Sequence, residues 1–461
     1  MSRPEVKPEI KPEIKIDHIE YLLTVDSDRR VLLDGAIVIG DGTITHVGPS
    51  SELAEIDADR VIDATGMLAT PGFINGHLHI SYAHAVRGIF PDDVEGRLAH
   101  VFAMQSAMTA DEEYVTTLLG LTEMLMTGTT TLVDPGTTRF PDACMAAYEA
   151  AGCRVITGEH VTDTDNDVNL PVYDTGEAID RMEASVAALH GRCDGRMTAW
   201  TMPFSLDVCS PELLKAAKRI ADEAGTSMTL HHQGAGDRTG SSPTARLAEI
   251  SVLGPNVLLS HCPGLSGEEI DLLAATGTSV VLCPSTVIKA GGHIAGTGRL
   301  PELLDAGVNV SLGTDSVNSS NFIDLVRVMQ LVATLYKDAR SDTTLIPPET
   351  AIELATRVGA QALHIPEIGA IEVGRRGDVV LFDTMRPQWR GLIDPARNLV
   401  HSATGDSVDT VIVEGRVVVE AGRACFVDDL GDLIDRVDTA GRRIRARTGR
   451  SFPSAWPATR E

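Results

Sequence analysis

The sequence Pro-Gly-Phe-Ile-Asn-Gly-His-Leu-His, at residues 71–79, is the stretch from which the fold and the site can both be worked out. Its apolar beginning predicts a strand that ends in His77 and His79. Alternate residues of a strand point to the same face, so the two imidazoles are expected on one side. Two imidazoles on one face suit a divalent metal ion, although two solvated histidines at a strand end would give the same pattern.

Three later apolar runs also contain residues that can bind a metal ion or transfer a proton. Each run is short and rich in Val, Leu or Met, which predicts a buried strand. If these strands are parallel in a (β/α)8 barrel, their carboxyl ends meet at the face where barrel enzymes place their active sites. The runs occupy residues 228–234, 256–262 and 308–316, and they carry His231, His261 and Asp315, respectively.

The order of these groups resembles the amidohydrolase superfamily, and in particular its branch of cytosine deaminases and triazine hydrolases. The wording Ser-His-Cys at 260–262, Leu-Cys-Pro-Ser at 282–285 and Ser-Leu-Gly-Thr-Asp-Ser at 311–316 carries the resemblance to that branch. The similarity extends from about residue 16 to about residue 430 and therefore covers nearly the whole chain. It implies an α/β fold, a TIM-like (β/α)8 barrel with a small β-sandwich formed from the N- and C-terminal segments.

Local patterns agree with this division of the chain. Short apolar runs separated by Gly and Asp turns, as at residues 35–43, predict antiparallel strands near both ends. Between them, strands alternate with helices, one of which is expected to begin after the N-cap Thr109 and to end at Gly128. Further barrel strands are predicted at 129–134, 154–159, 197–204 and 279–282. The expected domains are a flexible tail at 1–16, a β-sandwich at 17–70 and 368–425, the catalytic barrel at 71–367 and a helical extension at 426–461.

Composition limits the classes of partner. The chain of 461 residues has a formal charge of −26, which argues against nucleic acid and anionic membranes because both attract basic surfaces. It contains no apolar run of about 18 residues that would predict a membrane helix. Its seven cysteines include no Cys-x-x-Cys pair, and its first residues do not form an apolar secretion signal. We therefore expect a cytoplasmic protein that acts on a small molecule and forms a homo-oligomer.

The resemblance also implies a metal site. In it, His77, His79, His231 and Asp315 hold one divalent ion, which could be Zn, Co, Mn or Fe. Asp315 would also accept a proton from the attacking water and return it to the leaving group. His261 either binds the ion or polarises the scissile carbonyl, and we favour the second role. Relatives with two ions use a bridging lysine or glutamate that residues 197–204 lack, so one ion per chain is expected.

One departure from the branch bears on the reaction. Its deaminases carry His-x-x-Glu on the fifth strand, whereas here His231 is followed by His, Gln and Gly234. Without that acid, a carbamoyl compound such as a thiocarbamate, carbamate, urea or amide is the expected substrate, with release of an amine. The chain then resembles the herbicide-cleaving group that includes molinate hydrolase and the phenylurea hydrolases. Deamination or dechlorination of an aminopyrimidine or s-triazine, and a non-catalytic relative, are the alternatives.

Other polar and aromatic residues are weaker candidates for substrate contact. His84 and Arg87 belong to the loop after the first strand, and such loops line barrel active sites. Phe204 is a plausible pocket wall, although core packing would explain it equally well. His293, in a Gly-rich loop after the seventh strand, is either a lid residue or a solvated one. His232 should point away from His231 on a regular strand and is not expected to be a ligand.

Overall fold

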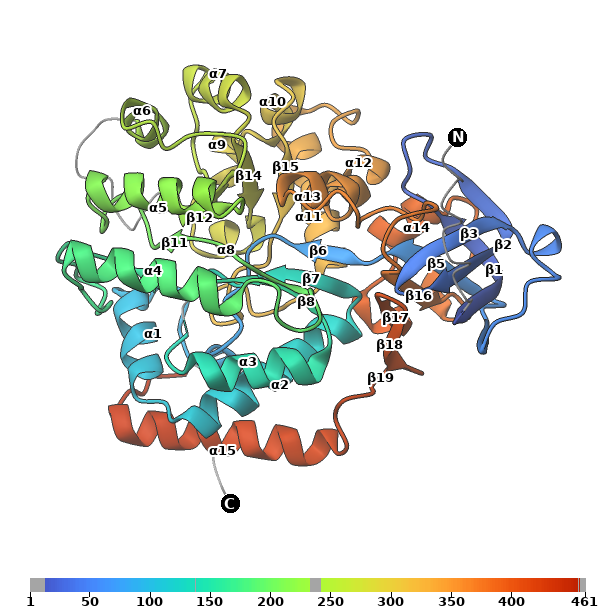
Figure 1. The fold of residues 1–461 in the computed structure, drawn as a ribbon, viewed down its shortest axis with the longest axis horizontal. Helices are drawn as coiled ribbons and strands as arrows, with labels where there is room; N and C mark the ends of the chain where they lie inside the picture. Colours follow the sequence, from blue (N-terminus) through green and yellow to red (C-terminus); the bar gives the residue numbers. More distant parts are fainter. Residues whose placement is uncertain (1–12, 137, 233–241, 455, 457–461) are drawn as a thin grey trace, which may run out of the picture.

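The computed structural model describes residues 13–136, 138–232, 242–454 and 456 (Figure 1). Parallel strands occupy the middle of the molecule, helices surround them, and a mixed, mainly antiparallel sheet lies to one side. The arrangement is a TIM-like α/β fold.

The central strands form two parallel four-stranded sheets and one short pair. Almost every residue in these strands is buried, because helices or other strands cover both faces. The first sheet contains β6 (Phe73–Asn75), β7 (Thr129–Val133), β8 (Arg154–Thr157) and β10 (Met197–Ala199). The second contains β12 (Met228–His231), β13 (Val257–Ser260), β14 (Ser279–Leu282) and β15 (Val310–Leu312), and the pair is β9 (His160–Val161) with β11 (Met202–Pro203).

The two parallel sheets meet at both edges. The amide of Gly76, just after β6, donates to the carbonyl of Leu312 in β15 at 2.8 Å. At the other edge, Thr201 donates to the carbonyl of Ser227 at 3.1 Å. Within the described ranges the strand ladder is not continuous around a closed ring. The closed barrel therefore stays a prediction, although the sheets adjoin where the barrel would close.

The helices begin and end largely where local sequence signals place them. Thr109 caps α2 (Ala110–Met126), as predicted, in a capping box with Glu112, and the helix ends two residues before Gly128. The strands predicted at 129–134, 154–159 and 279–282 are confirmed as β7, β8 and β14. The other helices are α1 (Arg97–Ser106), α3 (Pro141–Ala151), α4 (Thr175–Leu189), α5 (Pro211–Glu223), α6 (Pro243–Glu249), α7 (Gly267–Thr276), α8 (Pro284–Lys289), α9 (Ile294–Thr297), α10 (Leu300–Asp305), α11 (Leu325–Arg340), α12 (Pro348–Leu354), α13 (Arg357–Ala362), α14 (Pro395–His401) and α15 (Leu430–Thr448).

Two predicted strands are shorter than expected. The strand predicted to carry both histidines of residues 71–79 ends at Asn75, so His77 and His79 follow it. The predicted strand at 197–204 is divided into β10 and β11, with Trp200 and Thr201 between them. In both cases the chain leaves the ladder to bond a different neighbour, which a local hydrophobic pattern does not reveal.

Strands from the two ends of the chain pair in one nine-stranded sheet. Its order is β19-β18-β17-β16-β5-β1-β2-β3, with β4 beside β1. The strand β16 pairs antiparallel with β5, and β5 leads directly into β6, so this sheet fixes where β6 starts. The strands are β1 (Ile14–Leu23), β2 (Val31–Gly40), β3 (Thr43–Pro49), β4 (Arg60–Asp63), β5 (Met67–Pro71), β16 (Val379–Asp383), β17 (Val408–Val413), β18 (Arg416–Glu420) and β19 (Arg423–Ala424).

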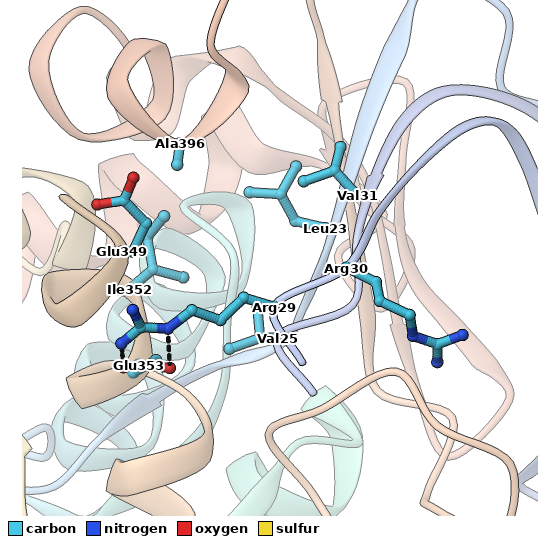
Figure 2. A pocket seen from close by; sticks show the side chains of 9 residues that line it. All are labelled: Leu23, Val25, Arg29, Arg30, Val31, Glu349, Ile352, Glu353 and Ala396. Atoms are coloured by element: carbon cyan, nitrogen blue, oxygen red, sulfur yellow. Dashed lines mark hydrogen bonds and ion pairs between the residues drawn. The ribbon is translucent and has the colours of Figure 1, made fainter. Parts of the chain in front are cut away.

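A small apolar cavity lies where this sheet meets α12 and α14 (Figure 2). Leu23, Ile352 and Ala396 line it, and Arg29 closes one side by donating to both carboxylate oxygens of Glu353 at 2.9 and 2.7 Å. Its volume of about 60 Å³ has room for one or two water molecules at most. This junction therefore contributes packing and an ion pair between the sheet and the helices.

The helix α15 follows the nine-stranded sheet and packs on the outside of α1 and α2 (Figure 1). Arg447 of α15 forms an ion pair with Glu112 of α2, and Phe452 beyond α15 packs edge-on against His100 of α1 at a ring distance of 5.2 Å. These contacts connect the C-terminal segment to α1, which lines the cavity described below. In the part of the chain that the structure covers, no helix has the length and apolar character needed to cross a membrane.

We predict that Gly76→Ala destabilises the protein. An added Cβ would lie 2.6 Å from Ser311 Oγ and 2.9 Å from Val281 Cγ2, so neighbouring strands must separate. Overpacking of this kind typically costs about 1–3 kcal/mol, which denaturant-induced unfolding would measure. Gly267→Ala is the matched control, because a Cβ there meets nothing within 4 Å. Equal stability of the Gly76 variant and the control would contradict the proposed close packing.

Candidate metal centre and active site

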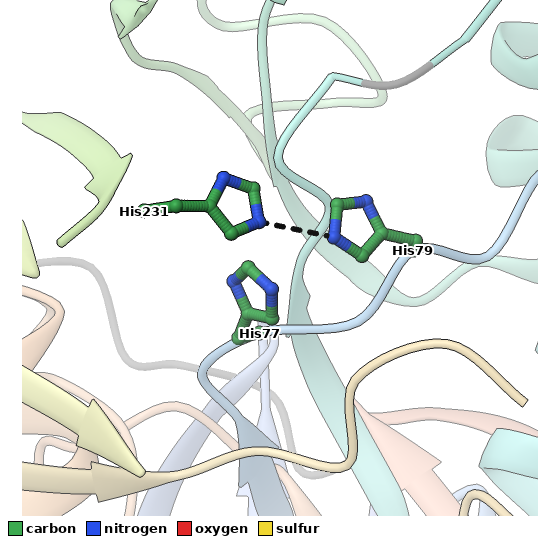
Figure 3. Close-up of side chains that lie close together, drawn as sticks. All are labelled: His77, His79 and His231. Atoms are coloured by element: carbon green, nitrogen blue, oxygen red, sulfur yellow. Dashed lines mark hydrogen bonds between the residues drawn. The ribbon is translucent and has the colours of Figure 1, made fainter. Parts of the chain in front are cut away.

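Three histidines meet at the carboxyl ends of β6 and β12 (Figure 3). His77 and His79 follow β6, and His231 is the last residue of β12. One ring nitrogen from each lies within 4.8 Å of the others. The structure thus brings His231 together with two histidines that lie 152 or more positions earlier in the chain, as the sequence motifs predict.

The hydrogen bonds of His77 and His231 are made by Nδ1, so their Nε2 atoms face the cluster. Nδ1 of His231 donates to the carbonyl of Phe204 at 2.8 Å, which fixes the tautomer that presents Nε2 as an acceptor. Nδ1 of His77 shares a hydrogen bond of 3.0 Å with Ser260, while its buried Nε2 has no partner among the described residues. An orphaned, buried acceptor is costly, and a divalent ion would satisfy it. The residues present therefore fit a metal ion.

Asp315 lies against the same cluster. Its Oδ1 is 3.8 Å from Nε2 of His79 and 4.0 Å from Nε2 of His77. The backbone holds it there, because its amide donates to the carbonyl of His77 at 2.9 Å and its Oδ1 accepts from the amide of Ser316 at 2.6 Å. Burial raises the pKa of the Asp315 carboxyl above its ordinary value. Such a group binds a proton more readily than an exposed aspartate, which suits a residue that accepts one from water.

His261 completes the group from the end of β13. Its ring centroid is 4.7 Å from that of His77 and 5.5 Å from that of His231. Burial lowers the pKa of His261 to about 4, and it has the same effect on His231. Burial also lowers the pKa values of His77 and His79 well below the ordinary range. All four imidazoles are therefore neutral at pH 7, the form that binds metal ions.

Two of these residues have unusual backbone conformations. His261 has a φ of 73° and Asp315 a φ of 58°, both in the left-handed region that favours glycine. Each such residue costs roughly 1–2 kcal/mol and persists only where its surroundings hold it. His261 follows β13 directly and Asp315 lies on the loop just after β15, and both side chains lie against the cluster. Strain of this kind at the ends of two strands is typical of functional sites.

A cavity of about 640 Å³ opens onto this group of residues, and His79, His231, His261 and Asp315 line it. Its walls are mainly apolar and aromatic, with Tyr82, Phe102 and Phe204 among them. Arg97 on α1 and Asn318 on the loop after β15 add polar groups. The sequence analysis missed these two residues and Phe102. No motif marks α1, whereas the position of Asn318 shortly after Asp315 was a usable signal.

The weaker candidates are placed as follows. Phe204 lines the cavity, and its ring centroid lies 4.6 Å from that of His231. His84 and Arg87 are not among the described lining residues, because both bind Glu123 behind the first loop. Burial raises the pKa of the Glu123 carboxyl, but His84 and Arg87 lower it more, so that this pKa is about 2. Their proposed contact with substrate stays a prediction.

Two further histidines lie apart from the metal cluster. His232 points away from His231, and its Nε2 is 2.8 Å from Thr244 Oγ1. His293 is exposed at the start of α9 and does not line the described cavity wall. Gly234, on which the choice of reaction depended, lies outside the described residues.

Comparison with known proteins agrees with this site. Residues 68–418 match the Amidohydrolase family, which covers most of the chain. The chain belongs to this family. It is therefore a metal-dependent amidohydrolase, as the sequence predicted, but the finer resemblance to herbicide-cleaving members is not confirmed.

Relatives along the whole chain are deaminases by name. The 5-methylthioadenosine/S-adenosylhomocysteine deaminase of Syntrophobacter fumaroxidans is 32% identical over 92% of this chain and 97% of its own length. The 5'-deoxyadenosine deaminase of Methanosarcina acetivorans is 32% identical over 93% of this chain and 97% of its own.

Solved structures share the fold. An adenosine deaminase from Xanthomonas campestris with bound zinc superposes with a TM-score of 0.85 at 25% identity, over 95% of this chain and all of that one. A zinc-bound atrazine chlorohydrolase from Arthrobacter aurescens superposes with a TM-score of 0.82 at 24% identity, over 93% of this chain and all of its own. These likenesses agree with the TIM-like α/β architecture.

We predict that His231→Ala loses the metal ion, while His232→Gln keeps it. The first change removes one of three converging nitrogens, whereas the second alters the neighbouring histidine that bonds Thr244 instead. Elemental analysis of the purified proteins after incubation with zinc measures the difference. One ion per chain is expected in the wild type and in the control. Two tightly bound ions per chain, or full metal content in His231→Ala, would contradict the mononuclear site.

Proposed function

We propose that this protein hydrolyses an amino group from the ring of an adenosine-like compound and releases ammonia. One observation supports this above others: similarity over more than nine-tenths of the chain to deaminases of 5-methylthioadenosine, S-adenosylhomocysteine and 5'-deoxyadenosine. Deamination was an alternative in the sequence analysis, and it now becomes the main proposal. The four groups that the resemblance assigns to the metal ion lie close together, and His79, His231 and Asp315 among them line the cavity.

The chemistry follows from where these side chains lie. An ion held by His77, His79, His231 and Asp315 would act as a Lewis acid that lowers the pKa of water to about 7. Asp315 would accept the water proton, because its carboxylate lies 3.8 Å from Nε2 of His79 and is held toward the cluster by the amide of Ser316. It then returns this proton to the departing amine. The neutral His261 lies opposite and donates a hydrogen bond to the atom that gains negative charge.

The cavity suits a planar, largely uncharged molecule. Its volume of about 640 Å³ lies within the range of small-molecule sites, and most of its wall is apolar. The rings of Phe102 and Phe204 are 5.9 Å apart and nearly perpendicular, so they form a continuous aromatic wall beside His231. A purine ring can stack on such a wall. The single arginine among the described lining residues does not form a cluster for a phosphate.

Carbamoyl hydrolysis is the second candidate, and Gly234 favours it. A ring nitrogen gains a proton during deamination, and the branch's deaminases supply it from the glutamate whose position holds glycine here. The carboxylates among the described lining residues are Asp167 and Asp315, and no glutamate is present there. A urea, carbamate or thiocarbamate has no ring nitrogen to protonate and needs only Asp315 and the ion.

The two candidates release different products. We would load the protein with zinc and offer it adenosine, 5'-deoxyadenosine, cytosine and an aminotriazine, and separately a phenylurea, a carbamate and a thiocarbamate. Ammonia from the nucleosides is the expected result. An amine from the carbamoyl compounds, with no ammonia from any ring, would reject deamination and establish the second candidate.

Asp315→Asn should lower turnover by about 10²–10⁴-fold, the usual cost of losing a positioned base. The amide keeps an oxygen beside the ion, so the metal content measured by elemental analysis should be retained. Asp167→Asn is the matched control, since it changes the exposed carboxylate of the same cavity. Near-normal turnover of the metal-loaded Asp315 variant would make that residue a spectator.

A further inference from the structure

Asn318 lies on the loop after β15, in the wall of the cavity that opens onto the metal cluster. Only 2% of its surface is exposed. Its Oδ1 accepts a hydrogen bond from Ser316 Oγ at 2.5 Å. Its Nδ2 is buried and has no hydrogen-bond partner among the residues described. Asn318 therefore presents an unused donor beside the groups assigned to catalysis.

An unpaired donor at this buried position destabilises the folded protein. Leaving a buried polar group unpaired costs about 1–3 kcal/mol, and an apolar side chain of similar size would avoid that cost. The other unpaired nitrogen of the site, Nε2 of His77, is accounted for by the metal ion. Nothing within the described protein accounts for Nδ2 of Asn318. Because Asn318 lines the cavity, a ligand bound there can supply a partner.

The loop also holds the amide in a fixed position. Ser316 Oγ bonds both Asn318 Oδ1 and Ser319 Oγ, the latter at 3.1 Å. The amide of the same Ser316 donates to Asp315 Oδ1. One short turn thus positions the base and the free amide relative to each other. Such preorganisation is expected where a side chain must meet a substrate atom.

We propose that Asn318 binds the substrate, with Nδ2 donating a hydrogen bond to one of its acceptor atoms. This inference rests on the proposed function, because an aminopurine ring offers unprotonated nitrogens as acceptors. The bond selects a planar ring that presents an acceptor toward the loop after β15. No proton is transferred, so Asn318 orients the ring while Asp315 moves the proton.

Binding and turnover can be separated to test this role. Zinc-loaded Asp315→Asn protein is expected to bind adenosine and to convert it about 10²–10⁴-fold more slowly, so calorimetry can measure the dissociation constant before much product forms. Adding Asn318→Leu to it should weaken binding by about 5–150-fold, the equivalent of about 1–3 kcal/mol. In otherwise wild-type protein, the same change should raise KM more than it lowers kcat. Elemental analysis checks that each variant keeps its metal.

A second variant separates hydrogen bonding from shape. Asn318→Asp keeps the size but loses the donor when ionised and regains one when protonated. Its activity relative to wild type at each pH should therefore recover as the pH falls, whereas Asn318→Leu should show no recovery. Asn321→Asp is the matched control, because it makes the same change on the same loop at an exposed residue outside the cavity lining. The control should behave as wild type.

Each outcome decides the matter. Unchanged adenosine binding in Asn318→Leu, or equal effects of Asn318→Asp and the control, would overturn the role of Asn318. If the reference protein binds a phenylurea and not adenosine, deamination fails, and the phenylurea becomes the probe. Weaker phenylurea binding in Asn318→Leu would then still support the role, because its carbonyl is also an acceptor. Binding of neither probe by the reference protein would overturn both proposals.

Discussion

The site depends on the hydrogen bonds that join the ends of β6 and β15. Asn75 makes two of them, donating to Thr314 Oγ1 at 2.8 Å and accepting from the Thr314 amide at 3.1 Å. A third runs from the Asp315 amide to the carbonyl of His77. These bonds connect the first and the last strand of the parallel sheets. They place a carboxylate that follows the last of these strands against two imidazoles that follow the first.

This junction is stable because the surrounding packing permits little movement. Gly76 allows the chain after β6 to approach Ser311. The preceding strand β5 pairs with β16 in the nine-stranded sheet, which fixes where β6 starts. The free energy of that packing offsets the cost of burying four imidazoles and a carboxyl together. The imidazoles remain neutral and the carboxyl binds protons readily, since burial disfavours both charged forms. Burial of these groups costs free energy in folding, but it also keeps the imidazoles in the neutral form that binds a cation and lets the carboxyl accept a proton more readily.

The sequence revealed which residues lie near the carboxyl ends of the strands better than it revealed the course of the chain between the strands. Apolar runs mark buried strands, so β13, β14 and the histidine at the end of β12 were predictable from local pattern. The left-handed turns at His261 and Asp315 were not, because they result from contacts between strands far apart in the chain. Arg97 and Phe102 were missed for a similar reason. Their helix α1 reaches the cavity through the packing of α15, which no periodicity near residue 97 records.

Charge offers one way to reconcile Gly234 with the deaminase relatives. A divalent ion beside an ionised Asp315 and four neutral imidazoles would leave the site positively charged. Such a site would stabilise negative charge that develops on the substrate during attack by water. An acid that protonates the ring nitrogen is then needed less, because an electron-poor ring can carry part of that negative charge. Hydrogen bonds to the ring would stabilise the charge further. His261 and Asn318 both line the cavity, and they are the neutral donors that we propose for this role. Under this proposal the same groups would serve either reaction, and the substrate would decide which bond is broken.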